Sequence, residues 1–286
     1  MNPNLIYPPC VICDYSGDDF KLVHKFEELS LVRCPNDGLV FFHPNVNLER
    51  HGQFLSKDFW VAPAFQKAQT VGGYSFDIYK KLLDAKPQII GYPDYLERQH
   101  LEAKVSWGRR ALQWFKLHAS EVKLHTVIDI GCATGHMLEG FLSIGGFKKA
   151  YGVDVCPWII EQGKRLLKSF VDQGSLKLIA GEVWNVECPD SLDCVILWDS
   201  IEHIQELEKA FTWIKSHTHS GSLMIIHTPD VNKAEGPNWY LWSPCQHCWF
   251  FSKDTLSLFL KKYEFNFVAE YTSPEVGEML LMYRRE

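Results

Sequence analysis

The second half of the chain alternates short apolar runs with helical stretches, and this alternation limits the fold more than any other feature. Residues 126–130 (TVIDI) read as a buried strand, and further strands are expected at residues 150–155, 176–180, 193–198 and 222–227. Helices are expected between them, including one from about His136 and one after Pro157, where the first turn of a helix accepts proline. This order predicts a parallel sheet covered by helices on both faces, with ligands at the carboxyl ends of the strands.

Two late strands extend the same sheet. They are expected at residues 264–272 and 277–285, after a helix near residues 253–262, and they bring the number of strands to seven. The predicted fold class is therefore α/β, with a doubly wound, mostly parallel seven-stranded sheet. Residues 1–60 instead contain short mixed runs around turns, and residues 61–120 are rich in helix formers. We expect a small N-terminal lobe at 1–60, a helical cap at 61–120 and the α/β domain at 121–286.

Composition excludes several classes of protein. Hydrophobic residues make up 46% and charged residues 22% of the 286 residues, which is typical of a globular chain. There is no apolar run of the roughly 20 residues that cross a bilayer, so we expect no membrane span. The first residues, MNPNLIYPPC, contain neither a basic segment nor a long apolar one, which favours a cytoplasmic protein. The nine cysteines are accordingly expected as thiols or metal ligands.

Charge argues against a nucleic-acid partner. The net charge is −6, and residues 1–60 contain eight acidic and five basic side chains. A nucleic-acid-binding lobe would show the opposite balance, because phosphate contacts need lysine and arginine. A small-molecule substrate is the partner that we expect. The sequence does not set the oligomeric state.

The turn after the first strand is the sharpest motif. Asp129 is followed by Ile130 and then by GCATG, which places Gly131 and Gly135 at a G-x-x-x-G spacing instead of the G-x-G-x-x-G of a dinucleotide site. The turn contains no lysine or arginine, which argues against a triphosphate. Asp154 ends the second strand, where a carboxylate can accept both hydroxyls of a ribose. The pattern therefore favours a nucleoside with a cationic tail that lacks phosphate.

These motifs resemble those of the class I S-adenosylmethionine (SAM) dependent methyltransferases. The resemblance runs from about residue 90 to the end of the sequence, and it includes VIDIGCATG, YGVDV, LWDSIEHI and HCWFFSKDTLSLFLKKYEFNFV. It implies a Rossmann-like sheet and the transfer of a methyl group from SAM to a small molecule. It also implies a set of cofactor contacts: Gly131, Cys132, Ala133 and Gly135 near the methionine moiety, Asp154 at the ribose, Val155, Glu182 and Val183 around the adenine, and Trp198 and Asp199 closing the pocket. Asp129 is a further expected cofactor contact, which faces the cationic tail.

The pair Glu202-His203 follows the fourth strand and is the candidate catalytic pair. It resembles the pair in ubiquinone-type O-methyltransferases and in sugar C-methyltransferases, and in the latter it is associated with proton removal. Histidine suits a general base because its unperturbed pKa is about 6.5. Substrate or cofactor positioning and simple local packing are the alternatives. Tyr95, in a G-Y-x-D-Y segment like that of related enzymes, is expected to bond the substrate or SAM or to pack locally, and His247 is a further candidate for the substrate cleft.

The first lobe contains a possible zinc site. Cys10-x2-Cys13 and Cys34-x2-Asp37 have the spacing of a zinc ribbon in which one ligand is changed. The context RCPNDGLVFFHP resembles the R-C-x-x-C-G-L-V-F-x-N-P knuckle that precedes a subset of these methyltransferases. Asp37 occupies the place of the fourth cysteine, and His24 or His43 could replace it. A metal-free remnant and unrelated thiols remain the alternatives, and Cys245-x2-Cys248 reads as a loop with two thiols.

Three other functions compete with a small-molecule methyltransferase. They are an RNA or protein methyltransferase guided by the cysteine lobe, a module that binds SAM without turnover, and a nicotinamide-dependent oxidoreductase. The glycine spacing disfavours the last, and the intact Glu202-His203 pair disfavours the second. The expected methyl acceptor is an oxygen or a sugar carbon made acidic by a neighbouring ketone, and less so a nitrogen.

Overall fold

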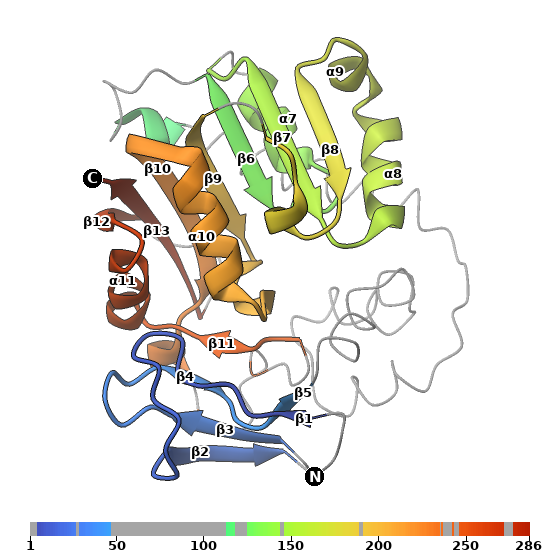
Figure 1. The fold of residues 1–286 in the computed structure, drawn as a ribbon. Helices are drawn as coiled ribbons and strands as arrows, with labels where there is room; N and C mark the ends of the chain where they lie inside the picture. The colour runs from blue at the N-terminus through green and yellow to red at the C-terminus, as the bar shows by residue number, and fades with distance from the viewer. Residues whose placement is uncertain are drawn as a thin grey trace.

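The structure of the protein is a computed structural model, drawn as a ribbon in Figure 1. It describes residues 5–26, 29–46, 113–117, 125–143, 146–188, 191–234, 236, 242, 246–271 and 277–286. Tyr95, Cys245 and most of the expected cap at 61–120 lie outside the described residues. Of the long helix expected over 95–118, the described residues 113–117 are helical, with Trp114 and Phe115 buried.

A seven-stranded sheet forms the main body. Its strands lie in the order β12-β13-β10-β9-β6-β7-β8. Their bounds are β6 (Thr126–Ile130), β7 (Lys149–Asp154), β8 (Leu176–Ala180), β9 (Leu192–Trp198), β10 (Thr218–Pro229), β12 (Phe265–Tyr271) and β13 (Glu278–Arg285). The pairs from β10 to β8 are parallel, and β13 is antiparallel to both of its neighbours. The predicted α/β class with a mostly parallel seven-stranded sheet is confirmed.

A second, smaller sheet is built mostly by the N-terminal residues. It contains β2 (Lys21–Phe26), β3 (Leu29–Arg33), β4 (Val40–Phe42) and β11 (Trp249–Phe250), in the order β11-β4-β3-β2. A separate pair joins β1 (Leu5–Ile6) to β5 (Asn45–Val46). In the four-stranded sheet, the edge strand β11 comes from the C-terminal part of the sequence, while the other three strands come from the N-terminal part. In Figure 1 the arrowheads of β6 and β8 point toward this small lobe, so the lobe lies at the carboxyl edge of the large sheet.

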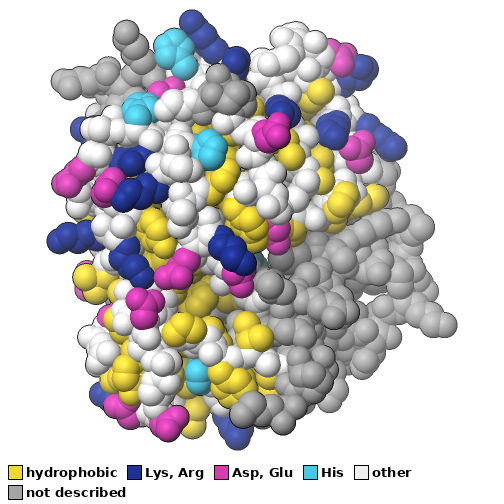
Figure 2. Space-filling model, in the orientation of Figure 1, with side chains coloured by type: hydrophobic (Ala, Val, Ile, Leu, Met, Phe, Trp, Pro, Cys, Tyr) yellow, Lys and Arg dark blue, Asp and Glu magenta, His cyan; other side chains and the backbone are white. Residues whose placement is uncertain are grey.

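The molecular surface seen in the orientation of Figure 1 carries charged side chains of both signs. Figure 2 shows lysine and arginine side chains interspersed with aspartate and glutamate, and not gathered into one patch. None of the helices in the described part of the chain combines the length and the apolar composition that crossing a membrane requires.

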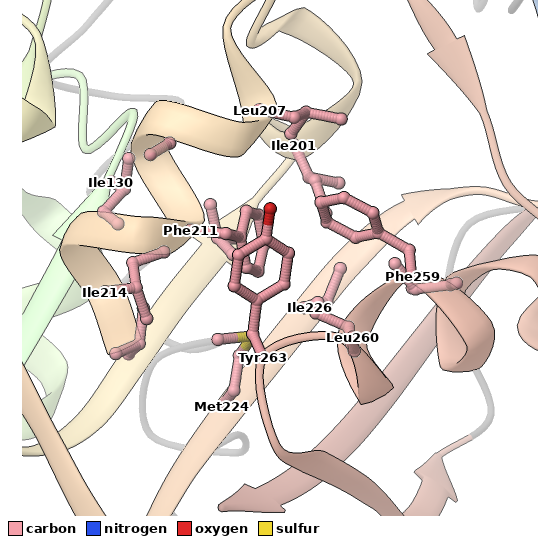
Figure 3. Packing of buried hydrophobic residues seen from close by; sticks show 14 of the residues in the cluster. Ile130, Ile201, Leu207, Phe211, Ile214, Met224, Ile226, Phe259, Leu260 and Tyr263 are labelled. Carbon is pink, nitrogen blue, oxygen red and sulfur yellow. The ribbon is translucent and has the colours of Figure 1, made fainter. Parts of the chain in front are cut away.

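Helices cover both faces of the large sheet because its strands alternate their buried side chains. In β6, Val127 packs with one cluster and Ile128 with the other. The first cluster includes α7 (His136–Ser143) and α8 (Pro157–Leu166), and the second includes α10 (Leu207–His217) and α11 (Lys253–Lys261). Figure 3 shows the second cluster, in which Phe211 of α10 and Phe259 of α11 lie around Tyr263 over the sheet.

Two predicted helices differ in extent from the structure. The helix after Pro157 stops at Leu166, because Leu167 leaves the helical conformation (φ −103°, ψ 27°) with its side chain buried, and the short helix α9 (Lys168–Asp172) follows. The helix after the fourth strand begins only at Leu207. Before it, the short 3-10 turn η3 (Ile201–His203) carries the candidate catalytic pair, and this separates the pair from the regular helix.

Candidate active site

The turn after β6 is shaped by backbone conformations that favour glycine. Gly131 and Gly135 have φ values of 79° and 82°, and Ala133 between them is also left-handed at 49°. A Cβ on Gly131 would lie 2.6 Å from Cβ of Ser200, so the turn packs directly against the segment after β9. A side chain at Gly131 has no room, which explains glycine there by close approach as well as by conformation.

Asp154 ties this turn to the end of β7. One carboxylate oxygen accepts the backbone N–H of Ala133 at 3.0 Å, and the other accepts that of Cys156 at 2.9 Å. Asp154 and Asp129 are both buried. A carboxylate has about four acceptor positions, so these two bonds are compatible with further bonds to ribose hydroxyls. The structure thus brings together the residues predicted to line the methionine and ribose parts of a cofactor.

The residues predicted around an adenine follow the ends of neighbouring strands. Val155, directly after β7, is 39% exposed, and Val183 in the turn η2 (Val183–Asn185) is buried. Glu182 precedes it; burial and then the charge of Glu206 raise the pKa of the Glu182 carboxyl. All three residues lie at the carboxyl edge of the sheet, on the same edge as Asp154. Their predicted contacts with a cofactor stay predictions.

A buried histidine connects the ends of β9, β10 and β13. His227 Nδ1 lies 2.5 Å from Oδ1 of Asp199, and its Nε2 lies 3.1 Å from Oε2 of Glu278. Trp198 stacks on the His227 ring with the centroids 4.5 Å apart. The Asp199 N–H also donates to the His227 carbonyl at 3.0 Å, which holds Asp199 in a left-handed conformation (φ 49°). Trp198 and Asp199, predicted to close the cofactor pocket, are therefore both in contact with His227, the first by ring stacking and the second through its carboxylate.

Sequence reasoning missed His227 and Glu278. The signal for His227 was present, because SLMIIH places a histidine at the expected carboxyl end of a strand, where ligands bind. Glu278 had no comparable signal. It begins the antiparallel strand β13, and only the pairing of Pro229 with Glu278 places it at the same edge as His227.

Glu202 is a buried carboxyl group with a strongly altered acidity. Its Oε2 accepts the hydroxyl hydrogen of Thr228 at 2.9 Å. Burial, followed by the nearby charge of Asp199, raises the pKa of Glu202 to about 8. Protonation of Glu202 is therefore favoured compared with that of an exposed carboxyl group.

His203 is oriented by the backbone of a distant segment. Its Nδ1 lies 3.2 Å from the carbonyl oxygen of Gln246. A carbonyl only accepts hydrogen bonds, so Nδ1 carries the hydrogen and Nε2 is the basic nitrogen of the neutral ring. The ring of His247 stands edge-on to that of His203, with the centroids 4.6 Å apart. The structure thus brings His247, the further candidate from the sequence, into contact with the predicted general base.

The cysteines of the small lobe converge with Asp37. Sγ of Cys10 lies 3.1 Å from Oδ2 of Asp37, and Sγ of Cys13 lies 3.6 Å from Sγ of Cys34. All four ligand atoms lie within 4.8 Å of one another, and the cluster includes neither His24 nor His43. Burial raises the pKa of the Cys13 thiol to about 11 and also that of Cys10. A bound divalent cation would reverse this, because metals bind the thiolate.

Two turns of the same geometry carry these ligands. The Cys10 N–H donates to the Tyr15 carbonyl at 2.9 Å, and the Cys34 N–H donates to the Leu39 carbonyl at 2.8 Å. Each turn then contains a left-handed residue directly after its second ligand: Asp14 (φ 58°) in the first and Gly38 (φ 85°) in the second. Asp37 therefore stands in the second turn where Cys13 stands in the first, as the spacing predicted.

Comparison with known families identifies the large domain. Residues 95–270 match the family model described as "Methyltransferase domain". The chain belongs to this methyltransferase family. The match confirms the predicted methyltransferase, and the matched residues include the turn after β6, Asp154 and the Glu202-His203 pair. In a comparison by sequence with curated proteins, no match was found.

Solved methyltransferase structures share the fold at low sequence identity. A SAM-dependent methyltransferase from Clostridium acetobutylicum ATCC 824 is 12% identical, with a TM-score of 0.50 over 72% of this chain and 98% of that one. SAM-bound CalS10, an amino pentose methyltransferase from Micromonospora echinaspora, is 12% identical, with a TM-score of 0.50 over 71% and 100%. DesVI from Streptomyces venezuelae is 11% identical, with a TM-score of 0.52 over 67% and 95%. At these identities the likeness shows the fold alone.

Proposed function

We propose that this methyltransferase acts on a small-molecule acceptor, at oxygen or at an acidic carbon, with His203 as its general base. One observation carries the proposal: the hydrogen bond of His203 Nδ1 to the Gln246 carbonyl, which makes Nε2 the basic nitrogen. His203 follows β9, at the sheet edge where the turn after β6 and Asp154 lie. A base at that edge is placed to serve a methyl acceptor.

The chemistry is an in-line displacement. SAM supplies the methyl group on a sulfonium, a good leaving group that becomes a neutral thioether when the carbon–sulfur bond breaks. The acceptor atom forms the new bond to carbon and loses a proton, which His203 Nε2 takes. The protein mainly aligns the reactants. In this proposal the Asp154 carboxylate accepts hydrogen bonds from the ribose hydroxyls of SAM, and the turn from Gly131 to Gly135 surrounds the methionine part of SAM.

The finer class of acceptor is part of the proposal. The Glu202-His203 pair supports a ubiquinone-type O-methyltransferase or a sugar C-methyltransferase. CalS10, which shares the fold, is an amino pentose methyltransferase, although its identity of 12% supports the fold alone. Against an RNA acceptor, residues 1–60 contain more acidic than basic side chains, and the face in Figure 2 has mixed charges.

We further propose that the cluster of Cys10, Cys13, Cys34 and Asp37 holds a structural zinc ion. The residues fit: four ligands of zinc-binding type come from two equivalent turns. A tetrahedral zinc site with Zn–S bonds of about 2.3 Å places its sulfur atoms roughly 3.8 Å apart, and Cys13 and Cys34 Sγ lie 3.6 Å apart. The ion would contribute folding free energy to the N-terminal lobe at 1–60. The division into this lobe, a cap at 61–120 and the domain at 121–286 is part of the same proposal.

A screen of metabolites with SAM tests the function. Release of S-adenosylhomocysteine that depends on one class of small molecule supports it, and His203→Ala serves as the matched inactive control. Release that depends on RNA or protein instead would overturn the small-molecule assignment. SAM binding without release across the whole screen, measured by calorimetry, would favour the non-catalytic module.

A further inference from the structure

We infer that residues 246–249 are a positioning element for the catalytic turn η3, and that the Cys/Asp cluster controls this element through β4. The inference rests on the proposed role of His203. The supporting observation is a path from the ligand turn at Cys34–Asp37 to the backbone of η3, which is made of hydrogen bonds at both ends and of the β4 backbone between them. It gives the proposed structural metal a second consequence, which is control of the geometry of the base.

The first part of the series joins residues 246–249 to η3 by three hydrogen bonds. The Cys248 N–H donates to the Glu202 carbonyl at 2.7 Å. The indole N–H of Trp249 donates to the Ile204 carbonyl at 2.8 Å. The His203 ring donates through Nδ1 to the Gln246 carbonyl at 3.2 Å. Each bond acts on a different residue of the turn or its cap, so together they fix both its backbone and the His203 ring.

The second part joins the same segment to β4. The Cys248 carbonyl accepts the N–H of Phe42 at 3.3 Å, and Trp249 pairs with Phe41 in the antiparallel register. The rings of Phe41 and Trp249 lie 5.6 Å apart, and both side chains are buried. Cys248 therefore makes backbone hydrogen bonds to both parts, through its N–H to η3 and through its C=O to the small lobe. Because one residue makes both bonds, a displacement of β4 is expected to displace η3 as well.

The third part joins β4 to the cluster. Leu39, the residue before β4, donates its N–H to Oδ1 of Asp37 at 2.9 Å, and its carbonyl accepts the Cys34 N–H at 2.8 Å. The other carboxylate oxygen of Asp37 accepts a hydrogen bond from Sγ of Cys10. The start of β4 is thus set by the same carboxylate that the proposed metal would bind. Loading or emptying the cluster changes the charge that Asp37 faces and so acts on this strand.

The turn η3 needs external support because it is short. A 3-10 turn of three residues has few internal bonds, here His203 N–H to the Ser200 carbonyl at 3.0 Å and Ile204 N–H to the Ile201 carbonyl at 3.3 Å. Methyl transfer is sensitive to alignment, and a displacement of about 1 Å can cost up to about 100-fold in rate. Asp154 accepts hydrogen bonds from Ala133 and Cys156, and neither residue belongs to η3 or to residues 246–249, so we expect the ribose site to change less than η3.

The indole bond of Trp249 offers the sharpest test. Trp249→Phe removes the N–H to Ile204 and keeps an aromatic ring on Phe41. The matched control is Trp242→Phe. Trp242 is also buried and packs on Phe250 with centroids 4.9 Å apart, but its N–H donates to the Gly236 carbonyl and not to η3. We expect Trp249→Phe to lower kcat about tenfold, with SAM affinity within about twofold of wild type, and Trp242→Phe to leave kcat within about twofold.

The second test changes the cluster itself. Zinc is removed from the full chain with a chelator and then restored, and Cys13→Ser provides a permanent loss. The readout that does not require turnover is the ¹⁵N signal of the His203 ring, assigned by its absence in His203→Gln. We expect zinc removal to shift this signal and to lower kcat without changing SAM affinity, and zinc to restore both. In Trp249→Phe the effect of zinc on kcat should be smaller.

The outcomes separate the inference from the proposed function. An unchanged His203 ring signal on zinc removal, or equal losses of kcat in Trp249→Phe and Trp242→Phe, would overturn the inference while leaving methyl transfer intact. A wild-type protein without turnover would overturn the proposed function, and the ring signal would still report on the coupling. Thermal unfolding of each variant identifies a general loss of fold. If Cys13→Ser unfolds, the reversible removal of zinc from the wild-type chain decides the question.

Discussion

The backbone N–H of Cys248 donates to the carbonyl oxygen of Glu202 at 2.7 Å, and this bond joins the turn of the proposed general base to the segment that enters the small sheet. Glu202 lies in the turn after β9, and Cys248 lies in the segment that leads into the small N-terminal sheet. The small lobe is therefore attached at the candidate active site itself.

Asp154→Ala should abolish measurable cofactor binding. The variant removes the proposed acceptor for two ribose hydroxyls and also the acceptor of the Ala133 N–H, which orders the turn. Hydrogen bonds to a charged group contribute ~1.5–3 kcal/mol each, so we expect at least about 100-fold weaker SAM binding by calorimetry. Cys156→Ser, which keeps the N–H that Asp154 accepts, is the control. Wild-type affinity in Asp154→Ala would refute the ribose assignment.

His203→Ala should bind SAM and lose turnover. General bases contribute about 10²–10⁴-fold to rate, so kcat should fall in that range while the dissociation constant of SAM stays within about twofold. His219→Ala is a suitable control, because His219 bonds Asp193, which accepts the N–H of Thr126 at the opposite end of β6. Full activity in His203→Ala would remove the base role.

Glu202 should make stability depend on pH. Its pKa in the folded protein is about 8, above the ordinary value, because the side chain is buried near Asp199; Thr228 and His227 offset this only in part. The folded state then holds a proton that the unfolded state releases, so this stabilisation is present below about pH 4.5 and is lost as the pH rises through 8. Glu202→Gln, which cannot ionise, should lose less of its melting temperature between pH 6 and pH 9 than the wild type. Parallel curves would contradict the assignment.

Gly163→Ala should destabilise the protein although it lies in a helix. In an open helix, alanine is better than glycine by roughly 0.5–1 kcal/mol. At Gly163 in α8, however, a Cβ would lie 2.5 Å from the carbonyl oxygen of Thr134, so the turn that carries Gly131 and Gly135 must move. Overpacking of this kind costs ~1–3 kcal/mol, and we expect a lower melting temperature together with weaker SAM binding. A variant with a higher melting temperature and unchanged SAM affinity would show that the turn accommodates the added methyl group, and it would contradict the prediction.

The freshly purified protein should contain about one zinc ion per chain. Cys34→Ser should lose the ion, and Asp37→Cys should bind it more tightly, because thiolate is a softer ligand than carboxylate. Plasma emission spectrometry gives the ratio, and competition with a chelator gives the order of affinity. A ratio near zero in wild-type protein would end the zinc proposal.

The sequence by itself determined the class of the fold and the location of its motifs. Apolar runs such as TVIDI and the turn GCATG predict a buried strand followed by a ligand-binding bend, because periodicity and glycine act locally. The spacing of Cys10, Cys13, Cys34 and Asp37 likewise predicts a zinc-ribbon-like set of ligands from sequence positions alone. These features require no knowledge of distant contacts, and the family match is consistent with them.

Only the tertiary structure decided what surrounds these residues. The pairing of β13 with β10 brings Glu278 to His227, and hydrogen bonds join Gln246 and Cys248 to the turn of His203. The hydrogen bond that orients His203 and the raised pKa of Glu202 depend on these long-range contacts and on burial. Local sequence cannot encode them, because hydrogen bonding and desolvation arise between segments that only folding brings together.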